Sequence, residues 1–493
     1  MRKLNAVVAV SFGCAFLWPC QVGAQFRGGP DWMTAGGDAN RSGWIRTDPK
    51  ISPERLRGSG FQLAWKIKLN HEPGPAATLS RYIGYRGFRS LGYVGSAAGE
   101  VTAIDTDLGR VEWNKTVPAG ARAGGVSSGC SAETMPEITR ATTAAFQAQG
   151  GRGGGFLPGR SGPAKSGVGD PGEGAVILQE IAARASADVA RGGRGPGGFG
   201  FQRTASYLDV LSEDGMLHRM YVSNGDEPAP AIPFLDRNAN AHGLIIIDNV
   251  AYVATSHGCG GAPNGVWALD LASKQVVHWT ANSDIAGEDG PAFGPDGTVY
   301  VATTGGELVA LAPKTLELKA TYRSGGQAFI ASPLVFEHKK KALILAASAD
   351  SRLHVVDAES LKGEAYSATV SGAPASWEDL AGTRWIAAPS NNSVAAWTLV
   401  DEGGTAALKP GWTSREMSSP LPPMVINGVL FAVSNSTAPA IYALEASTGT
   451  PLWNSGTTIA ATVRNGRLTG SDSQIYLGTS DGTIYAFGFP IEH

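Results

Sequence analysis

The residues of this chain that are best suited to chemistry are polar or aromatic side chains placed near predicted turns. Carboxylate oxygens can hold Ca²⁺ or act as general bases, and an indole can stack on a planar ring. Guanidinium and imidazole groups can bind anions or move protons. The residues concerned are Glu288, Asp289, Glu378, Asp379, Trp377, Arg122 and His242. Each also has an ordinary interpretation, because acids beside strands often cap turns and aromatic residues there usually pack.

Motifs for nucleophilic or phosphate chemistry are absent or weak. The chain contains no Gly-x-x-x-x-Gly-Lys-Ser/Thr loop and no His-Glu-x-x-His pair. The segment Gly125–Gly129 matches Gly-x-Ser-x-Gly, but it lacks the preceding strand and the following helix that a nucleophile elbow requires. Function must therefore depend on how the fold groups the residues named above.

The first 24 residues have the layout of an export signal. Arg2 and Lys3 precede an apolar run from Leu4 to Trp18, and the small residues Val22-Gly23-Ala24 come just before Gln25. The run is too short to span a bilayer, and no later segment approaches the roughly 20 apolar residues that a transmembrane helix needs. We therefore expect residues 25–493 to be a periplasmic or secreted protein without a membrane span. A buried N-terminal helix is the alternative for the leader.

The charge of the chain argues against nucleic acid as a partner. Removing the leader takes away two basic residues and no acid, which leaves 38 Lys and Arg against 43 Asp and Glu, a formal charge of −5. Nucleic-acid binding proteins usually carry a concentrated basic surface. A small molecule or another exported protein is the expected partner.

A segment of two short strands, a turn and a third strand bearing a tryptophan recurs along the chain. Its first copy is Tyr93–Trp113, and the clear copies from Tyr252 onward begin 42 to 48 residues apart. Because one hairpin cannot bury both of its faces, repeated copies must stack on each other. A period near 45 with several strands per unit is typical of propeller blades. Counting a weaker copy at Tyr207, the copies begin at Tyr93, Tyr207, Tyr252, Tyr300, Leu343, Trp385, Phe431 and Tyr476.

The two ends of the chain predict how the ring closes. The last copy, Tyr476–Phe487, lacks a strand with a tryptophan, whereas the strand around Trp65 belongs to no copy. We predict an all-β, eight-bladed β-propeller in which this N-terminal strand pairs with the C-terminal blade. Such pairing removes the exposed edges that an open array would leave.

The repeat also carries a family resemblance. The pattern Tyr-Val-Gly-Ser…Gly…Ala-Ile-Asp…Gly…Trp at Tyr93–Trp113 resembles the repeat of the pyrroloquinoline quinone (PQQ) dehydrogenases and their PQQ-like propeller relatives. The resemblance covers nearly all of the chain after the leader and implies eight blades. For the dehydrogenases it also implies PQQ and Ca²⁺ in the central channel. The chain departs from those enzymes because it has no Cys-Cys pair, which commonly lies beside the quinone, and no Cys-x-x-Cys-His haem motif.

Two cysteines, Cys130 and Cys259, remain after the leader is removed. An even pair in an exported protein is most simply a disulfide. Cys130 precedes the inner strand of the second blade and Cys259 lies in a turn of the third, positions that share one face of a propeller. We predict that they are bonded, with two free thiols as the alternative.

The repeat pattern breaks between residues 141 and 203. The range Gly150–Gly200 holds 17 glycines, several of them next to arginines. Such a composition cannot bury enough apolar surface to fix its backbone. We interpret residues 141–203 as a flexible insertion in the second blade, with RNA binding by its Gly-Arg tracts as the less favoured reading.

Two functions follow for the residues at the central channel. In a dehydrogenase that oxidises an alcohol or sugar, Asp289 or Asp379 would be the base and Glu288 a Ca²⁺ ligand. Contacts to the cofactor would come from Arg122, His242, Trp377 and Glu378. In a binding or assembly platform, the ring would present its rims to another exported protein. The missing cysteine pair favours the platform. The polar residues around the channel leave the dehydrogenase as the alternative.

Overall fold

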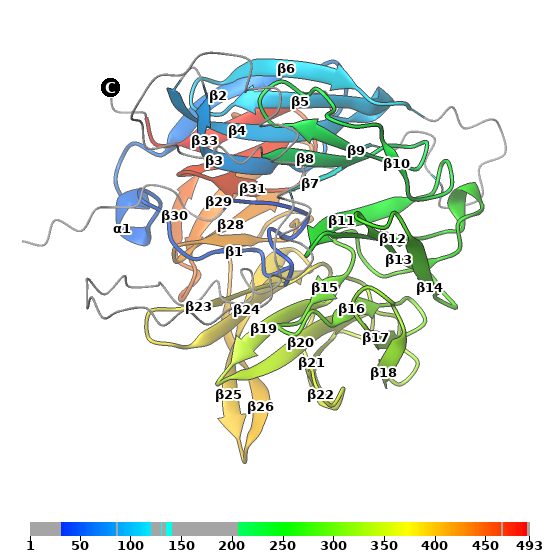
Figure 1. Ribbon diagram of the computed structural model, residues 1–493. Helices are drawn as coiled ribbons and strands as arrows, with labels where there is room; N and C mark the ends of the chain where they lie inside the picture. The colour runs from blue at the N-terminus through cyan, green and yellow to red at the C-terminus, as the bar shows by residue number, and fades with distance from the viewer. Residues whose placement is uncertain are drawn as a thin grey trace, which may run out of the picture.

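The computed structural model describes residues 31–84, 87–119, 130, 135–140, 206–464 and 467–490. In these ranges nearly every element is a strand, and the strands form eight sheets that follow one another around a ring (Figure 1). The predicted eight-bladed propeller is therefore confirmed. Each of the eight repeat copies begins in the second strand of one blade.

The blades follow the order of the chain. Blade 1 has β3 (Ala77–Gly84), β4 (Gly87–Ser96), β5 (Glu100–Asp105) and β6 (Arg110–Thr116), and blade 2 has β7 (Glu137–Thr139), β8 (Tyr207–Leu211), β9 (Met216–Tyr221) and β10 (Ile232–Pro233). Blade 3 has β11 (Ala241–Ile247), β12 (Val250–Thr255), β13 (Gly265–Asp270) and β14 (Val276–Thr280), and blade 4 has β15 (Ala292–Phe293), β16 (Val299–Ala302), β17 (Glu307–Leu311) and β18 (Leu318–Arg323).

The second half of the ring repeats the arrangement. Blade 5 has β19 (Leu334–His338), β20 (Lys341–Ser348), β21 (Arg352–Asp357) and β22 (Gly363–Ser367), and blade 6 has β23 (Ala375–Glu378), β24 (Arg384–Ser390), β25 (Ser393–Glu402) and β26 (Thr405–Thr413). Blade 7 has β27 (Met424–Ile426), β28 (Val429–Ser434), β29 (Ala440–Glu445) and β30 (Pro451–Asn454), and blade 8 has β31 (Thr469–Ser471), β32 (Gln474–Gly478), β33 (Thr483–Gly488) and β2 (Gln62–Lys68).

Inner strands of neighbouring blades lie against each other around the axis of the ring. We call the face where the inner strands begin the upper face and the face where they end the lower face. Turns between the second and third strands also lie on the upper face, because the strands within a blade are antiparallel.

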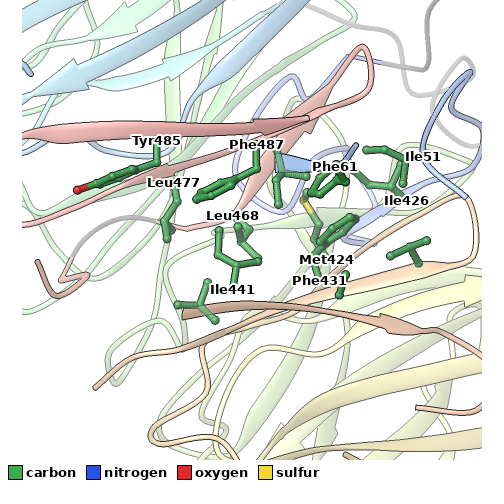
Figure 2. Packing of buried hydrophobic residues seen from close by; sticks show 14 of the residues in the cluster. Ile51, Phe61, Met424, Ile426, Phe431, Ile441, Leu468, Leu477, Tyr485 and Phe487 are labelled. Carbon is green, nitrogen blue, oxygen red and sulfur yellow. The ribbon is translucent and has the colours of Figure 1, made fainter. Parts of the chain in front are cut away.

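The ring closes as predicted, by pairing of the two ends of the chain. Strand β2 is the outer strand of blade 8 and runs antiparallel to β33, with Trp65 opposite Ala486 and Ile67 opposite Ile484. Just before β2, the Phe61 ring packs 5.8 Å from the Phe431 ring, so the same segment joins blades 7 and 8 (Figure 2). Burying an aromatic side chain of this kind stabilises the fold by about 2–3 kcal/mol.

Tryptophans on the outer strands of blades 8, 1 and 6 connect each of these blades to the next. The indole N–H of Trp65 donates to the carbonyl of Thr106 (2.7 Å), that of Trp113 to Val222 (3.0 Å), and that of Trp412 to Ala446 (2.9 Å). Each acceptor directly follows the third strand of the next blade. The repeated tryptophan therefore supplies both a flat packing surface and a satisfied N–H group.

An N-terminal strap, residues 32–48, runs along the inner strands of the ring. In the middle of Figure 1 it appears in blue with β1 (Trp44–Ile45), which pairs in parallel with β27. It hydrogen-bonds to all eight blades in turn: Trp32 to Thr78, Met33 to Arg140, Thr34 to Leu244, Asn40 to Phe293 and Val335, Ser42 to Ser376, Gly43 to Val425, and Asp48 to Ser473. The strap thereby gives partners to backbone groups on inner edges that face the axis.

Helical structure is sparse in the part of the chain that the structure describes. Helix α1 (Pro53–Leu56) follows the strap, and the Ser52 side chain caps it by accepting a hydrogen bond from the Arg55 N–H (3.3 Å). Among the described residues, no helix has the length and apolar character needed to cross a membrane.

Candidate functional site

Three of the predicted residues meet at the upper mouth of the channel. His242 is the second residue of β11, and Glu288 and Asp289 lie in the segment that leads from blade 3 into β15. The backbone of Asp289 packs directly against Gly243, where a Cβ atom would lie 2.3 Å from the Asp289 carbonyl oxygen. The negative charges of both acids act on the His242 imidazole. The structure therefore brings His242 close to this acidic pair.

His242 is a buried imidazole beside the backbone of Asn240, which favours the protonated ring. The residue is only 5% exposed, and neither ring nitrogen makes a hydrogen bond of standard geometry within the described chain. Burial lowers the pKa of His242, although the charges of Glu288 and Asp289 oppose that shift. The ring is therefore neutral at neutral pH and keeps one donor and one acceptor nitrogen.

Asp289 forms an ion pair with Arg467, which precedes β31. Asp289 precedes the inner strand of blade 4, whereas Arg467 precedes the inner strand of blade 8, half a ring away. The pair therefore bridges opposite sides of the channel mouth. Arg467 has no local motif, so the sequence alone did not indicate this partner.

Glu137 is a further acid at the mouth that sequence reasoning missed. It begins β7, and its carboxylate accepts hydrogen bonds from the backbone N–H groups of Gly243 (3.0 Å) and Leu244 (3.3 Å). Burial of the carboxyl group raises the pKa of Glu137 to about 7, and the charge of Glu288 adds to the increase. Glu137 can therefore gain or lose a proton near neutral pH.

Arg41 reaches the same site from the strap. Its guanidinium donates to the carbonyls of Pro291 (2.9 Å) and Gly243 (2.9 Å) and to the Thr34 hydroxyl (3.0 Å). Burial lowers the pKa of Arg41 to about 10, which leaves it charged at neutral pH. Arg41 lies in a loop-like stretch of small residues, so the sequence did not predict that it donates hydrogen bonds at the upper mouth.

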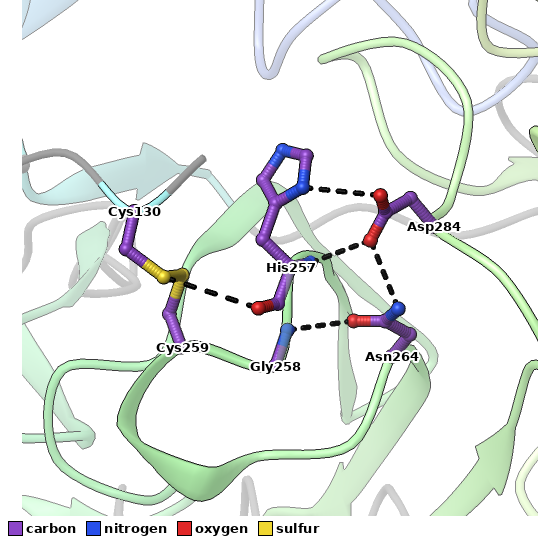
Figure 3. Close-up of a disulfide and its surroundings, with 6 residues drawn as sticks. All are labelled: Cys130, His257, Gly258, Cys259, Asn264 and Asp284. Atoms are coloured by element: carbon purple, nitrogen blue, oxygen red, sulfur yellow. Dashed lines mark hydrogen bonds and ion pairs between the residues drawn. A yellow bond between two sulfur atoms is a disulfide. The ribbon is translucent and has the colours of Figure 1, made fainter. Parts of the chain in front are cut away.

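The predicted disulfide lies on the same face. Cys130 and Cys259 are bonded, and their Cα atoms are 5.8 Å apart. The turn of blade 3 that carries Cys259 is held by Asp284, which accepts hydrogen bonds from the His257 backbone N–H (2.7 Å) and from Asn264 (2.9 Å) (Figure 3). The bond thus ties the segment before blade 2 to a turn that is already fixed in blade 3.

The other predicted residues lie in blade 6, away from the upper mouth. The ring of Trp377 is buried between blades 6 and 7, where it stacks on Trp385 with ring centroids 6.0 Å apart. Glu378 ends β23 and accepts a hydrogen bond from Arg384 (2.9 Å). Asp379 caps the turn to β24, accepting from two backbone N–H groups and from the Trp385 indole (2.9 Å). These three residues are at the lower end of their inner strand.

Two remaining points concern cofactors. Arg122 lies outside the described residues, so its predicted contact with a cofactor stays a prediction. Among the residues that are described, no group of three His, Cys, Asp or Glu side chains is arranged to hold a metal ion.

Two serine–histidine pairs have the geometry of a hydrolytic site. Ser212 Oγ lies 3.0 Å from His218 Nε2, and His218 Nδ1 lies 3.0 Å from Glu227 Oε1. Blade 5 repeats the pair, with Ser348 Oγ 2.8 Å from His354 Nε2. Both serines are buried, at 4% and 0% exposure, so neither hydroxyl can reach a substrate. Their recurrence at the same turn of two blades indicates a structural role in fixing that turn.

Comparison with known proteins supports the fold. No family model and no curated protein sequence matches the chain. Its structure resembles the quinohemoprotein alcohol dehydrogenase of Comamonas testosteroni, with a TM-score of 0.56, 13% identity, and coverage of 94% of this chain and 81% of that one. It also resembles a europium-containing methanol dehydrogenase (TM-score 0.53, 12% identity, 93% and 98% coverage). A third similar structure is BamB from Moraxella catarrhalis (TM-score 0.50, 13% identity, 88% and 99% coverage). At these identities the likeness shows the eight-bladed propeller fold and no activity.

Proposed function

We propose that this protein is an exported PQQ-like propeller that acts as a binding or assembly platform. The observation that supports this best is the state of the groups expected to serve a quinone and Ca²⁺. Asp289 is paired with Arg467, Asp379 caps a turn, and Trp377 is enclosed between two blades. Side chains already bound within the scaffold are not free to bind a cofactor. Export by the leader at residues 1–24 and the insertion at 141–203 form part of this proposal.

The described residues do not fit a Ca²⁺ site of the usual kind. Ca²⁺ takes six to eight oxygen ligands from several converging carboxylates, carbonyls and waters. At the upper mouth, Glu137 already accepts two backbone hydrogen bonds and Asp289 holds a guanidinium group. We therefore assign no catalytic step to a quinone or to Ca²⁺ in this chain.

A PQQ- and Ca²⁺-dependent dehydrogenase is the second candidate, and His242 is the reason to keep it. A buried neutral imidazole could accept a proton from a substrate hydroxyl beside Asp289. In this candidate Glu288 would bind the metal, and Arg122 would hold a quinone carboxylate.

Reconstitution separates the two candidates. The purified protein is incubated with PQQ and Ca²⁺, dialysed, and examined for quinone absorbance and for dye reduction with alcohols and sugars. The platform predicts no retained absorbance and no dye reduction. Retained quinone with substrate-dependent dye reduction, lost in Asp289→Asn and His242→Ala but kept in the turn variant Ser212→Ala, would establish the dehydrogenase instead.

A further inference from the structure

A second polar site lies on the lower face, between the strap and blades 4, 5 and 6. It is a cavity of about 40 Å³ whose walls include Arg46, Arg384, Trp44 and Asp38. Arg46 and Trp44 belong to the strap, and Arg384 is the first residue of β24. None of these residues takes part in the hydrogen bonds of the upper mouth.

Two guanidinium groups share one indole in this cavity. The Arg46 Cζ atom lies 4.3 Å from the centre of the Trp44 ring, and the Arg384 Cζ atom lies 5.5 Å from it. Arg384 also lies 5.5 Å from the ring of Phe336. Aromatic faces hold a guanidinium in place without using its N–H groups, so those groups remain available to a ligand.

Hydrogen-bond donors remain free on both arginines. One terminal nitrogen of Arg384 donates to the Glu337 carbonyl (3.0 Å) and to Glu378 (2.9 Å), but its Nε is buried and has no acceptor. The Arg384 side chain is only 6% exposed, so a missing acceptor there is costly. Arg46 forms no hydrogen bond or ion pair among the described residues.

The charges around the cavity disfavour an anion with two charges. Glu378 already compensates Arg384. Asp38 accepts hydrogen bonds from the N–H (3.0 Å) and the hydroxyl (2.6 Å) of Ser42, and burial raises its pKa. In the described ranges Arg46 forms no ion pair, although the charges of Asp38, Glu378 and the wall residue Glu337 act on it, and these acids would repel a dianion such as phosphate.

We propose that this cavity binds one carboxylate group between Arg46 and Arg384. The cavity is small, with a volume of about 40 Å³, which suits a planar carboxylate. Paired donors on guanidinium groups match the two oxygens of a carboxylate. The carboxylate belongs either to a small free acid or to an acidic side chain of a bound protein, and the second source rests on the proposed platform function.

Calorimetric titration at constant ionic strength tests the site. The probes are sodium acetate, a blocked Gly-Glu-Gly peptide and inorganic phosphate, with chloride as the balancing salt. We expect saturable binding of acetate or of the peptide and at least about tenfold weaker binding to Arg46→Gln, because one charged hydrogen-bonding group is lost. Acetate binding alone identifies a free acid as the ligand, whereas tighter binding of the peptide identifies an acidic side chain.

Arg415→Gln provides the matched control. Arg415 also lies over an aromatic ring, with its Cζ atom 5.0 Å from the centre of Tyr442, but it is exposed and does not line the cavity. Its loss should leave acetate binding unchanged. The proposal is overturned if no carboxylate probe binds, if phosphate binds better than acetate, or if the two arginine variants weaken binding equally. None of these outcomes depends on the PQQ reconstitution.

Discussion

At the scale of single residues, the upper mouth of the channel is a set of charged groups that compensate each other. Arg467 meets Asp289 across the ring, and Arg41 fixes the backbone around Gly243. Glu137 differs from these residues because, in the part of the chain that the structure describes, backbone N–H groups and no basic side chain donate hydrogen bonds to its carboxylate. Burial still disfavours the charged form of the carboxylate. Its protonation should therefore be visible in the stability of the protein.

Glu137→Gln should change how stability depends on pH. The pKa of Glu137 is about 7 in the folded protein and close to 4.5 in the unfolded chain, so the folded state binds the proton more tightly. Stability from this group is present below about pH 4.5 and is lost as pH rises to about 7. The amide variant cannot ionise, and its stability relative to the wild type should increase by about 3 kcal/mol as pH rises from about 4.5 to about 7.

Urea unfolding at a series of pH values measures this difference. Glu317→Gln removes a negative charge from an exposed position and serves as the control. Parallel stability curves for the wild type and Glu137→Gln would show that the Glu137 proton is not coupled to folding.

At the scale of elements, close contact between blades depends on glycines that face tryptophans. Gly449 has a φ of 71°, and a Cβ atom there would lie 2.5 Å from the Trp412 ring. Gly109 faces Trp65 in the same way, and Gly225 faces Trp113. The turns before these three outer strands are thus held to a glycine both by their backbone conformation and by the neighbouring blade.

Gly449→Ala should therefore cost more than an alanine at another glycine with positive φ. The strained backbone alone costs about 1–2 kcal/mol, and displacement of the Trp412 ring should add about 1–3 kcal/mol. Gly325→Ala is the matched control, because Gly325 has a φ of 84° but no atom within 4 Å of its Cβ position. Thermal and urea unfolding of both variants measure the difference, and equal losses would refute the packing contribution.

At the scale of the whole molecule, three features keep the ring closed. Strand β2 completes blade 8, the strap joins all eight blades, and the disulfide links the segment before blade 2 to blade 3. Within the described residues, the Asp289–Arg467 pair also links blades 4 and 8, whereas the other contacts between inner strands join neighbouring blades. Long-range connections of this kind make the unfolding of one blade costly for the rest.

Removal of the disulfide should lower stability substantially. Cys130 and Cys259 are separated by 129 positions in the sequence, and closing so long a loop stabilises the folded state by about 4–5 kcal/mol in the chain-entropy model. The double variant Cys130→Ser, Cys259→Ser should unfold at correspondingly lower urea concentration. Reduced wild-type protein should match the variant, and the variant should be insensitive to reductant. Equal stability of the oxidised protein and the double variant would contradict this prediction.

Repetition in the sequence determined the fold, the number of blades, the pairing of Trp65 with the last blade, and the partners in the disulfide. Repeats report fold reliably because each blade is built from local hairpins whose turns and apolar alternation lie within a short stretch of chain. The closure followed from a strand missing in the last copy and a strand around Trp65 that belongs to no copy. The cysteine pairing followed from counting thiols and placing two segments on one face of the ring.

Only the tertiary structure decided the composition of the sites. Arg467 and Asp289 are 178 positions apart, and Arg41 meets Pro291 across 250 positions, so no local pattern records either contact. The sequence also did not predict the roles of Trp377 and Asp379. Their residue types suit a cofactor, but in the structure Trp377 packs against Trp385 and Asp379 caps a turn. The repeat depends on neighbours along the chain, so the sequence predicted it. Side-chain chemistry depends on neighbours brought together by folding, so the sequence alone did not predict it.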